Sequence, residues 1–135
     1  MEQQRGQSEQ RALVIVVDDN PAVRSSLKFS LEIEGFRVRT YARGHDLLND
    51  ADLQDCNCFV IDHNMPDMNG LDAIAALRRR HISTPAILIT SYPTAALSDR
   101  AAGGGVPIVE KPLLGNTLLE RIQDVIRLQS GSAGG

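Results

Sequence analysis

Cysteine and histidine are scarce in this sequence, which has two cysteines and three histidines among 135 residues. Cys56 and Cys58 are separated by a single residue, which is too close for an unstrained disulfide. No further cysteine and no pair of histidines at ligand spacing completes a zinc site. We therefore expect both cysteines to be reduced residues of the core or of a loop, and we exclude a disulfide-based scaffold.

Long apolar runs and a strong charge of one sign are also missing. No stretch approaches the roughly 18 apolar residues that a membrane-spanning helix needs. Residues 1–11 contain no apolar segment of the kind found in secretory signals. The formal net charge of -3 gives no broad electrostatic reason to bind nucleic acid or a membrane. These absences predict a cytoplasmic protein without direct nucleic-acid or membrane binding by this domain.

The length and composition are those of one globular domain. The chain is 42% hydrophobic and 23% charged, which is ordinary for a protein that buries a single core. We expect residues 1–10 to be a disordered polar segment and residues 11–128 to form the domain. Residues 129–135 are rich in Ser and Gly, and we expect them to be a flexible tail or a linker.

Short apolar runs alternate with helical periodicity along the whole chain. The runs predict strands, and the periodic segments predict helices. Such alternation is typical of an α/β, doubly wound (βα)5 fold, a flavodoxin-like three-layer sandwich with parallel sheet order 2-1-3-4-5. Pro107 suits this order, because a proline in a strand is tolerated mainly at a sheet edge. The expected strands are 13–17, 36–41, 58–61, 86–90 and 106–110, and the expected helices are 21–34, 44–49, 70–80, 94–102 and 116–128.

Polar residues with complementary chemistry stand where four of these strands end. Asp18 and Asp19 follow the first strand, Asp62 the third, Thr90 ends the fourth, and Lys111 follows the fifth. In a doubly wound sheet the binding site lies outside the carboxyl ends of the strands. We therefore expect these side chains to converge at one edge of the sheet.

Three gathered carboxylates repel one another unless a cation, a lysine or protonation compensates them. Their hard oxygen atoms suit Mg²⁺. We expect Asp19 and Asp62 to bind the metal directly, Asp18 to bind it through water or as a second ligand, and the backbone carbonyl of Asn64 to fill another position. Asp62 is the candidate nucleophile for forming an aspartyl phosphate. Lys111 and the Thr90 hydroxyl are expected to contact phosphoryl oxygens.

The parts of this constellation differ in specificity. An Asp-Asp pair after a strand is as consistent with two solvated loop acids as with a metal site. A Thr at the end of a strand is weaker evidence for a site, since strands favour Thr for packing, and a Lys-Pro pair is common in loops. The stretch from Asp62 to Gly70, which reads Asp-x-x-Met-Pro-x-Met-x-Gly, is the specific element. The combination of all these residues in this order, each at the end of a strand, is very unlikely to arise by chance.

On these residues the chain resembles the receiver domains of response regulators in two-component signalling, over about residues 11–128. The resemblance implies that Asp62 accepts a phosphoryl group from a sensor histidine kinase or a phosphotransfer protein, with Mg²⁺ held by Asp18 and Asp19. It assigns phosphoryl-sensing roles to Thr90 and Lys111. It also implies a cis peptide between Lys111 and Pro112.

The resemblance predicts a regulatory switch and not an enzyme that turns over a substrate. Phosphorylation is expected to move Thr90 and to change the face formed by helix 94–102, strand 106–110 and helix 116–128. That face would act on an output domain or a downstream protein, or pair two copies as a homodimer. One position departs from the family, since Ile108 stands where receivers usually have Tyr or Phe, and this predicts either an intact switch or altered coupling.

Two other classes of function remain open at this stage. A haloacid-dehalogenase-type phosphatase also uses an aspartyl nucleophile, but it needs a second Asp at the position of Asn64. The other alternative is a phosphorylation-independent, receiver-like interaction module. Ile108 leaves room for it, whereas the complete set of acidic, Thr and Lys residues argues against it.

Overall fold

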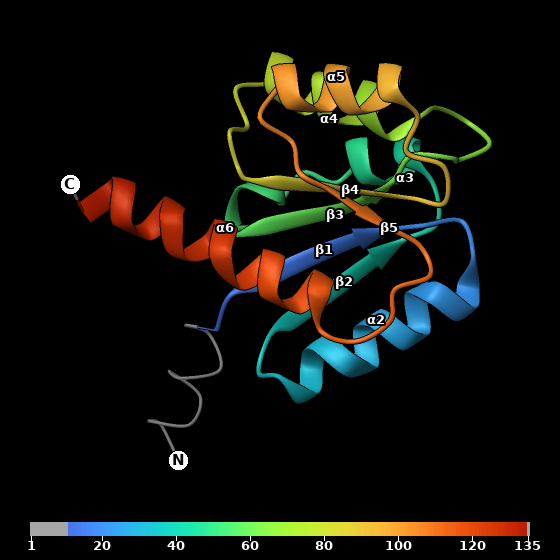
Figure 1. Ribbon diagram of the computed structural model, residues 1–135. Helices are drawn as coiled ribbons and strands as arrows, with labels where there is room; N and C mark the ends of the chain where they lie inside the picture. Colours follow the sequence, from blue (N-terminus) through green and yellow to red (C-terminus); the bar gives the residue numbers. More distant parts are fainter. Residues whose placement is uncertain (1–10, 135) are drawn as a thin grey trace.

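The computed structural model describes residues 11–134, so the disorder predicted for residues 1–10 lies outside the described part of the chain. Strands and helices alternate as predicted (Figure 1). The strands are β1 (Leu13–Val17), β2 (Arg37–Tyr41), β3 (Cys58–Asp62), β4 (Ala86–Thr90) and β5 (Ile108–Glu110). The helices are α2 (Pro21–Ile33), α3 (Gly44–Leu48), α4 (Gly70–Arg79), α5 (Ala95–Gly103) and α6 (Thr117–Gly134), with a short 3-10 turn, η1 (Leu53–Asp55).

All neighbouring strands pair in parallel, in the order β2-β1-β3-β4-β5. The predicted fold class and sheet order are therefore confirmed. Parallel pairing brings the carboxyl ends of all strands to one edge of the sheet. The register pairs Val17 of β1 with Ile61 of β3, so the residues that follow these two become neighbours at that edge.

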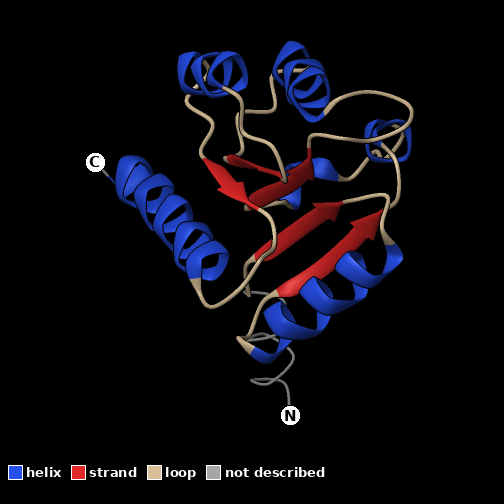
Figure 2. Cartoon of the chain, turned by 45° about the vertical axis from the view of Figure 1, so that its right-hand side comes forward, coloured by secondary structure: helices blue, strands red, loops and turns tan. Residues whose placement is uncertain are grey.

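Two hydrophobic cores lie on opposite faces of the sheet, which is the middle of three layers (Figure 2). In β1, Ile15 and Val17 pack against α3, α4 and α5, whereas Val14 and Val16 pack against α2 and α6. This division follows from the alternation of side chains along a strand. The three central strands are buried throughout, as expected for a parallel sheet covered on both faces.

Side-chain caps fix where three helices begin, beside the carboxyl edge of the sheet. Asn20 accepts a hydrogen bond from the backbone N–H of Ala22 at 2.9 Å, and Pro21 occupies the first turn of α2, as predicted. Asn69 caps α4 and Thr94 caps α5 through their side-chain oxygens. The polar loops that hold the candidate site are thus bounded by defined helix starts.

The cysteines behave as predicted, since both are free and buried. Cys56 belongs to the core beneath α3, α4 and α5, and Cys58 belongs to the core beneath α2 and α6. The sheet therefore separates the two thiols. Within residues 11–134, no helix has the length and apolar character required to cross a membrane.

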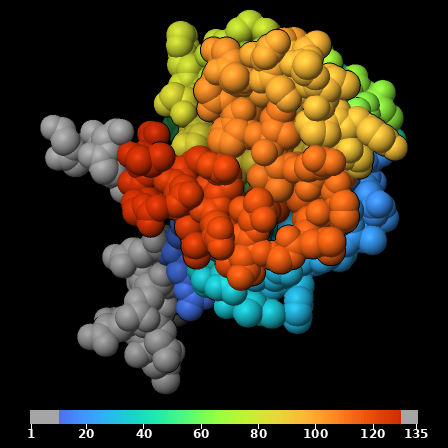
Figure 3. Space-filling model, in the orientation of Figure 1, coloured from blue at the N-terminus to red at the C-terminus, as the bar shows by residue number. Residues whose placement is uncertain are grey.

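Two boundaries differ from the predictions by more than one residue. The last strand begins at Ile108 and not at residue 106, because Pro107 has no N–H to donate and contributes only its carbonyl, which accepts from Leu88 N at 2.9 Å. The edge position of β5 is as predicted. Helix α6 continues to Gly134, beyond the helix end predicted at residue 128. The flexible tail or linker predicted over residues 129–135 stays a prediction. Figure 3 looks onto the surface on which α5, β5 and α6 meet.

Candidate functional site

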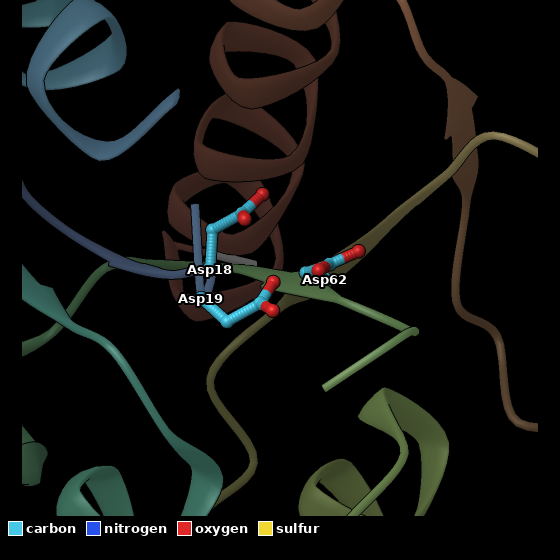
Figure 4. Close-up of side chains that lie close together, drawn as sticks. All are labelled: Asp18, Asp19 and Asp62. Atoms are coloured by element: carbon cyan, nitrogen blue, oxygen red, sulfur yellow. The ribbon is translucent and has the colours of Figure 1, made fainter. Parts of the chain in front are cut away.

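Three carboxylates meet where β1 and β3 end. Asp18 and Asp19 follow β1, and Asp62 is the last residue of β3 (Figure 4). Each offers one oxygen atom, and these three oxygens lie within 4.8 Å of one another. Asp18 and Asp62 are buried, with 0% and 2% of their surface exposed, whereas Asp19 is exposed. The predicted convergence of the acidic residues is present.

Backbone amides hold the two buried carboxylates in place. Asp18 Oδ1 accepts a hydrogen bond from the backbone N–H of Asn20 at 2.9 Å, and Asp62 Oδ1 accepts one from the N–H of Asn64 at 3.3 Å. Arg24 adds a further tie, because its guanidinium donates to the backbone carbonyl of Asp18 at 2.8 Å. The loops after β1 and β3 are thus shaped around these acids.

Lys111 brings a positive charge into contact with both buried acids. Its Nζ lies 2.9 Å from Asp18 Oδ2 and 3.4 Å from Asp62 Oδ1. Burial alone would lower the pKa of Lys111, but the hydrogen bond to Asp18 and the negative charges of both acids outweigh burial and raise it. The ammonium group therefore stays charged at neutral pH. The peptide bond between Lys111 and Pro112 is cis, as predicted.

Asp62 is nevertheless disfavoured as an anion. Burial is the largest cause that raises the pKa of Asp62, to about 6, and the negative charge of Asp18 is the next. Lys111 and the Asn64 amide act in the opposite direction and offset only part of this. Three carboxylates share the positive charge of one lysine here, so a bound cation would relieve the repulsion that remains.

Thr90 ends β4 next to this group and is 1% exposed. Its Oγ1 accepts hydrogen bonds from the Tyr92 backbone N–H at 3.3 Å and from Asn64 Nδ2 at 3.4 Å. Its backbone carbonyl accepts from the N–H of Lys111 at 2.8 Å. The Thr and the Lys predicted to sense a phosphoryl group are therefore joined through the backbone.

The residues present fit a magnesium ion. Asp18 Oδ2 is buried, and the contact given for it among the described residues is the one with Lys111 Nζ at 2.9 Å. An exposed carboxylate, Asp19, completes a set of hard oxygen donors with one side open to water, which is the environment that Mg²⁺ prefers. Asp18, Asp19 and Asp62 would hold the ion. The role predicted for the Asn64 carbonyl stays a prediction.

Ile108, at the position predicted to matter for switching, is the first residue of β5. It is half-buried and packs against the core beneath α3, α4 and α5. Its side chain is therefore part of the packed interior in this state.

Two contacts of the loop after β3 were not predicted from the sequence. Asp67 accepts hydrogen bonds from the backbone N–H groups of His45, at 2.9 Å, and Gly44, at 3.3 Å, and it contacts His45 Nδ1 at 2.6 Å. The second contact is that of the Asn64 side chain with Thr90. Both join residues more than 20 positions apart, and the local sequence carries no signal for either.

Comparison with known proteins assigns the chain to a family. The family described as the response regulator receiver domain matches residues 14–123. The chain belongs to this family. Receiver domains are regulatory and are not classical enzymes, and they typically bind Mg²⁺ at an acidic pocket. This assignment sets aside the phosphatase alternative.

Similar proteins include two bacterial transcriptional regulators. The chain is 32% identical over 121 residues to the C4-dicarboxylate transport transcriptional regulatory protein DctR of Rhodobacter capsulatus, covering 87% of this chain and 61% of that protein. It is 28% identical over 121 residues to the cell cycle transcriptional regulator CtrA of Caulobacter vibrioides, covering 89% and 52%. This receiver domain thus spans little more than half the length of these relatives.

Solved receiver structures share the fold over nearly their whole length. A CheY-like receiver domain from Methanospirillum hungatei superposes with a TM-score of 0.83 at 25% identity, covering 91% of this chain and 99% of that one. The chemotaxis protein CheY4 of Vibrio cholerae gives a TM-score of 0.77 at 28% identity, covering 85% and 98%. The flavodoxin-like architecture predicted from the sequence is therefore confirmed.

Proposed function

We propose that this receiver domain is a phosphorylation-controlled switch in which Asp62 accepts a phosphoryl group from a sensor histidine kinase or a phosphotransfer protein. The observation that carries the proposal is the position of Lys111 Nζ, 2.9 Å from Asp18 and 3.4 Å from Asp62, at the carboxyl edge of the sheet. A nucleophilic carboxylate, a cation for the incoming phosphoryl oxygens and an acidic metal site then occupy one pocket.

In the transfer step, an Asp62 carboxylate oxygen attacks the phosphorus atom. The new P–O bond forms as the P–N bond to the donor histidine breaks, and its electron pair returns to the imidazole nitrogen. Lys111 supplies positive charge to the phosphoryl oxygens. A bound Mg²⁺ would neutralise further negative charge on those oxygens and on the three acids.

Phosphorylation then changes the balance of forces around Thr90. It adds about -1.5 to -2 charges and strong acceptor oxygens at neutral pH. The Thr90 hydroxyl can donate to one of these oxygens. We propose that its movement repacks the loop after β4 and helix α5, whose buried residues are only Leu97 and Ala101, and so alters the face of α5, β5 and α6 (Figure 3).

That face is the proposed contact with what the switch controls. Because the DctR and CtrA relatives are named as transcriptional regulators and are longer than this chain, we propose control of a transcriptional output domain or a downstream protein. A homodimer formed through the same face is one means of that control, and we place the protein in the cytoplasm.

Incubation with phosphoramidate and Mg²⁺, followed by intact-mass measurement, tests the proposal. The wild type should gain one phosphoryl group, and Asp62→Asn should gain none. Asp67→Asn, in the same loop but bonded to Gly44 and His45, should still be labelled. Undiminished labelling of Asp62→Asn would refute the assignment of the acceptor, and no labelling of the wild type would favour the phosphorylation-independent module.

A further inference from the structure

The side chain of Asn64 links the acceptor loop to Thr90. Asn64 Nδ2 donates to Thr90 Oγ1 at 3.4 Å, and the second donor to the same oxygen is the Tyr92 backbone N–H at 3.3 Å. A hydroxyl oxygen has two acceptor positions and one proton to donate. Both acceptor positions of Thr90 are therefore taken, which fixes the rotation of a side chain that is 1% exposed.

The two donors are anchored differently. The backbone of Asn64 is held by the acceptor residue, since its N–H donates to Asp62 Oδ1 at 3.3 Å. Its loop is closed by an antiparallel bridge between Asn64 and Asn69 and by the hydrogen bond from Gly70 N to His63 O at 3.0 Å. Tyr92 belongs to the loop after β4, which is the segment proposed to move. A displacement of Thr90 can carry the Tyr92 donor with it, but not the Asn64 donor.

We propose that the Asn64 side-chain amide is a latch on the Thr90 hydroxyl, which favours the unphosphorylated arrangement and sets how readily the switch moves. This inference rests on the proposed function. A contact present in only one of two states biases the equilibrium toward that state. At 3.4 Å the bond is close to the limit of a hydrogen bond, so a small shift of Thr90 breaks it.

The role is a positioning role, distinct from the metal contact predicted for the backbone carbonyl of the same residue. Asn64→Ala removes the amide donor and keeps the backbone carbonyl and N–H. A long hydrogen bond, in the weaker half of the ordinary range, corresponds to about a two- to fivefold change in the equilibrium between the two states. The variant should therefore favour the activated arrangement by about that factor.

Binding of beryllofluoride, a stand-in for the phosphoryl group, measures this equilibrium in the Mg²⁺-loaded protein. Titration followed by NMR should give an apparent Kd for Asn64→Ala that is about two- to fivefold lower than for the wild type. Asn64→Ser, whose shorter side chain lacks the amide, should behave alike. Tyr92→Phe keeps its backbone donor and should leave the beryllofluoride Kd unchanged. Titration with Mg²⁺ alone should give the same Mg²⁺ Kd for Asn64→Ala as for the wild type.

A double-mutant cycle separates the latch from a general effect on access to the pocket. In Thr90→Val there is no hydroxyl to hold, so adding Asn64→Ala should not change the beryllofluoride Kd further. If Asn64→Ala lowers the beryllofluoride Kd equally in the Thr90→Val background, or does not lower it in the wild-type background, the latch is overturned and the proposed function is left intact. Failure of the wild type to bind beryllofluoride would overturn the proposed function itself, and the latch with it.

Discussion

The Asp62 carboxyl group titrates closer to neutrality than an ordinary aspartate. Its pKa is raised to about 6, first by burial and then by the charge of Asp18, so the charged form is less stable in the folded protein than in the unfolded chain. A raised acid pKa contributes stability that is fully present below the unfolded value, near 3.8, and is lost as the pH rises through about 6. The repulsion between Asp62 and Asp18 is therefore strongest at neutral pH and above.

We therefore predict that Asp62→Asn stabilises the metal-free protein at pH 7.5 and has little effect at pH 4. The gain in the free energy of unfolding should be about 1–3 kcal/mol, since each unit of pKa shift corresponds to about 1.4 kcal/mol and the shift already includes the favourable contact with Lys111. Urea unfolding in EDTA at the two pH values measures the difference. A lower stability of the variant at pH 7.5 would contradict this account.

Ile108 occupies its position as a fixed packing residue. Its branched side chain is half-buried against the core and has no ring or polar tip that could exchange between an inner and an outer position. Ile108 therefore offers no counterpart to the aromatic residue that receivers usually carry at this position, and under the proposed function the movement falls to Thr90 and its loop. The sequence predicted the departure, but not whether it weakens coupling.

Helix α3 depends on a residue from a distant loop. No side chain at its own N-terminal cap position, Arg43, accepts a hydrogen bond from the first turn. Asp67 supplies that acceptor from the loop after β3. Burial would raise the pKa of Asp67, but hydrogen bonds from His45 and Gly44 hold it at about 2.

Asp67→Ala should lower the free energy of unfolding by about 1 kcal/mol at pH 7, the usual cost of losing a helix cap. Because the pKa of Asp67 is depressed, its contribution is present above the unfolded value near 3.8 and is lost as the pH falls through about 2. The difference between variant and wild type should thus shrink below pH 3.8. An unchanged difference at pH 2, in urea unfolding, would show that the carboxylate charge is not responsible.

The start of α4 is pressed against the end of β3. A Cβ atom on Gly70 would lie 2.6 Å from Leu88 Cδ1 and 2.7 Å from the Asp62 backbone oxygen. We predict that Gly70→Ala destabilises the protein by about 1–3 kcal/mol, the range for overpacking, and slows labelling of Asp62. Gly103→Ala is the matched control, since its Cβ would meet nothing within 4 Å and should stabilise α5 slightly. If Gly70→Ala and Gly103→Ala change the midpoint of thermal unfolding equally, overpacking at Gly70 is not the cause.

Element types were predictable because local patterns decide them, whereas some boundaries were not. Asn20 and Pro21 predict the start of α2 from the sequence alone. β5 begins at Ile108 because Pro107 offers the neighbouring strand only its carbonyl, which accepts from Leu88 N. That pairing joins residues far apart in the sequence, so the boundary depends on a tertiary contact. The end of α6 at Gly134 was likewise not predicted from the local pattern.

At the scale of the molecule, parallel pairing brings residues from the ends of four strands into one site. This is why Asp18, Asp62, Thr90 and Lys111 could be predicted from their places at strand ends. The Asn64 and Asp67 side-chain contacts could not, because they depend on how a single loop folds back over the sheet edge.

Binding of Mg²⁺ should stabilise the whole domain. At about 100 times the Kd, a ligand specific for the folded state adds about 2.7 kcal/mol, so the midpoint of thermal unfolding should rise with Mg²⁺ and fall again with EDTA. Asp19→Asn should largely lose this response. Asp99→Asn, an exposed acid on α5, should retain it, and an equal loss in both variants would argue against a specific site.

The two buried thiols lie on opposite sides of the sheet, Cys56 with the core under α3, α4 and α5, and Cys58 with the core under α2 and α6. Burial raises the pKa of both thiols, that of Cys56 to about 12, so neither should react with a maleimide while its layer is closed. Alkylation rates, resolved by peptide mapping, would therefore report separately how often each helical layer lifts from the sheet. The two cysteines are therefore built-in probes of whether the helical layers on the two faces of the sheet open together or independently.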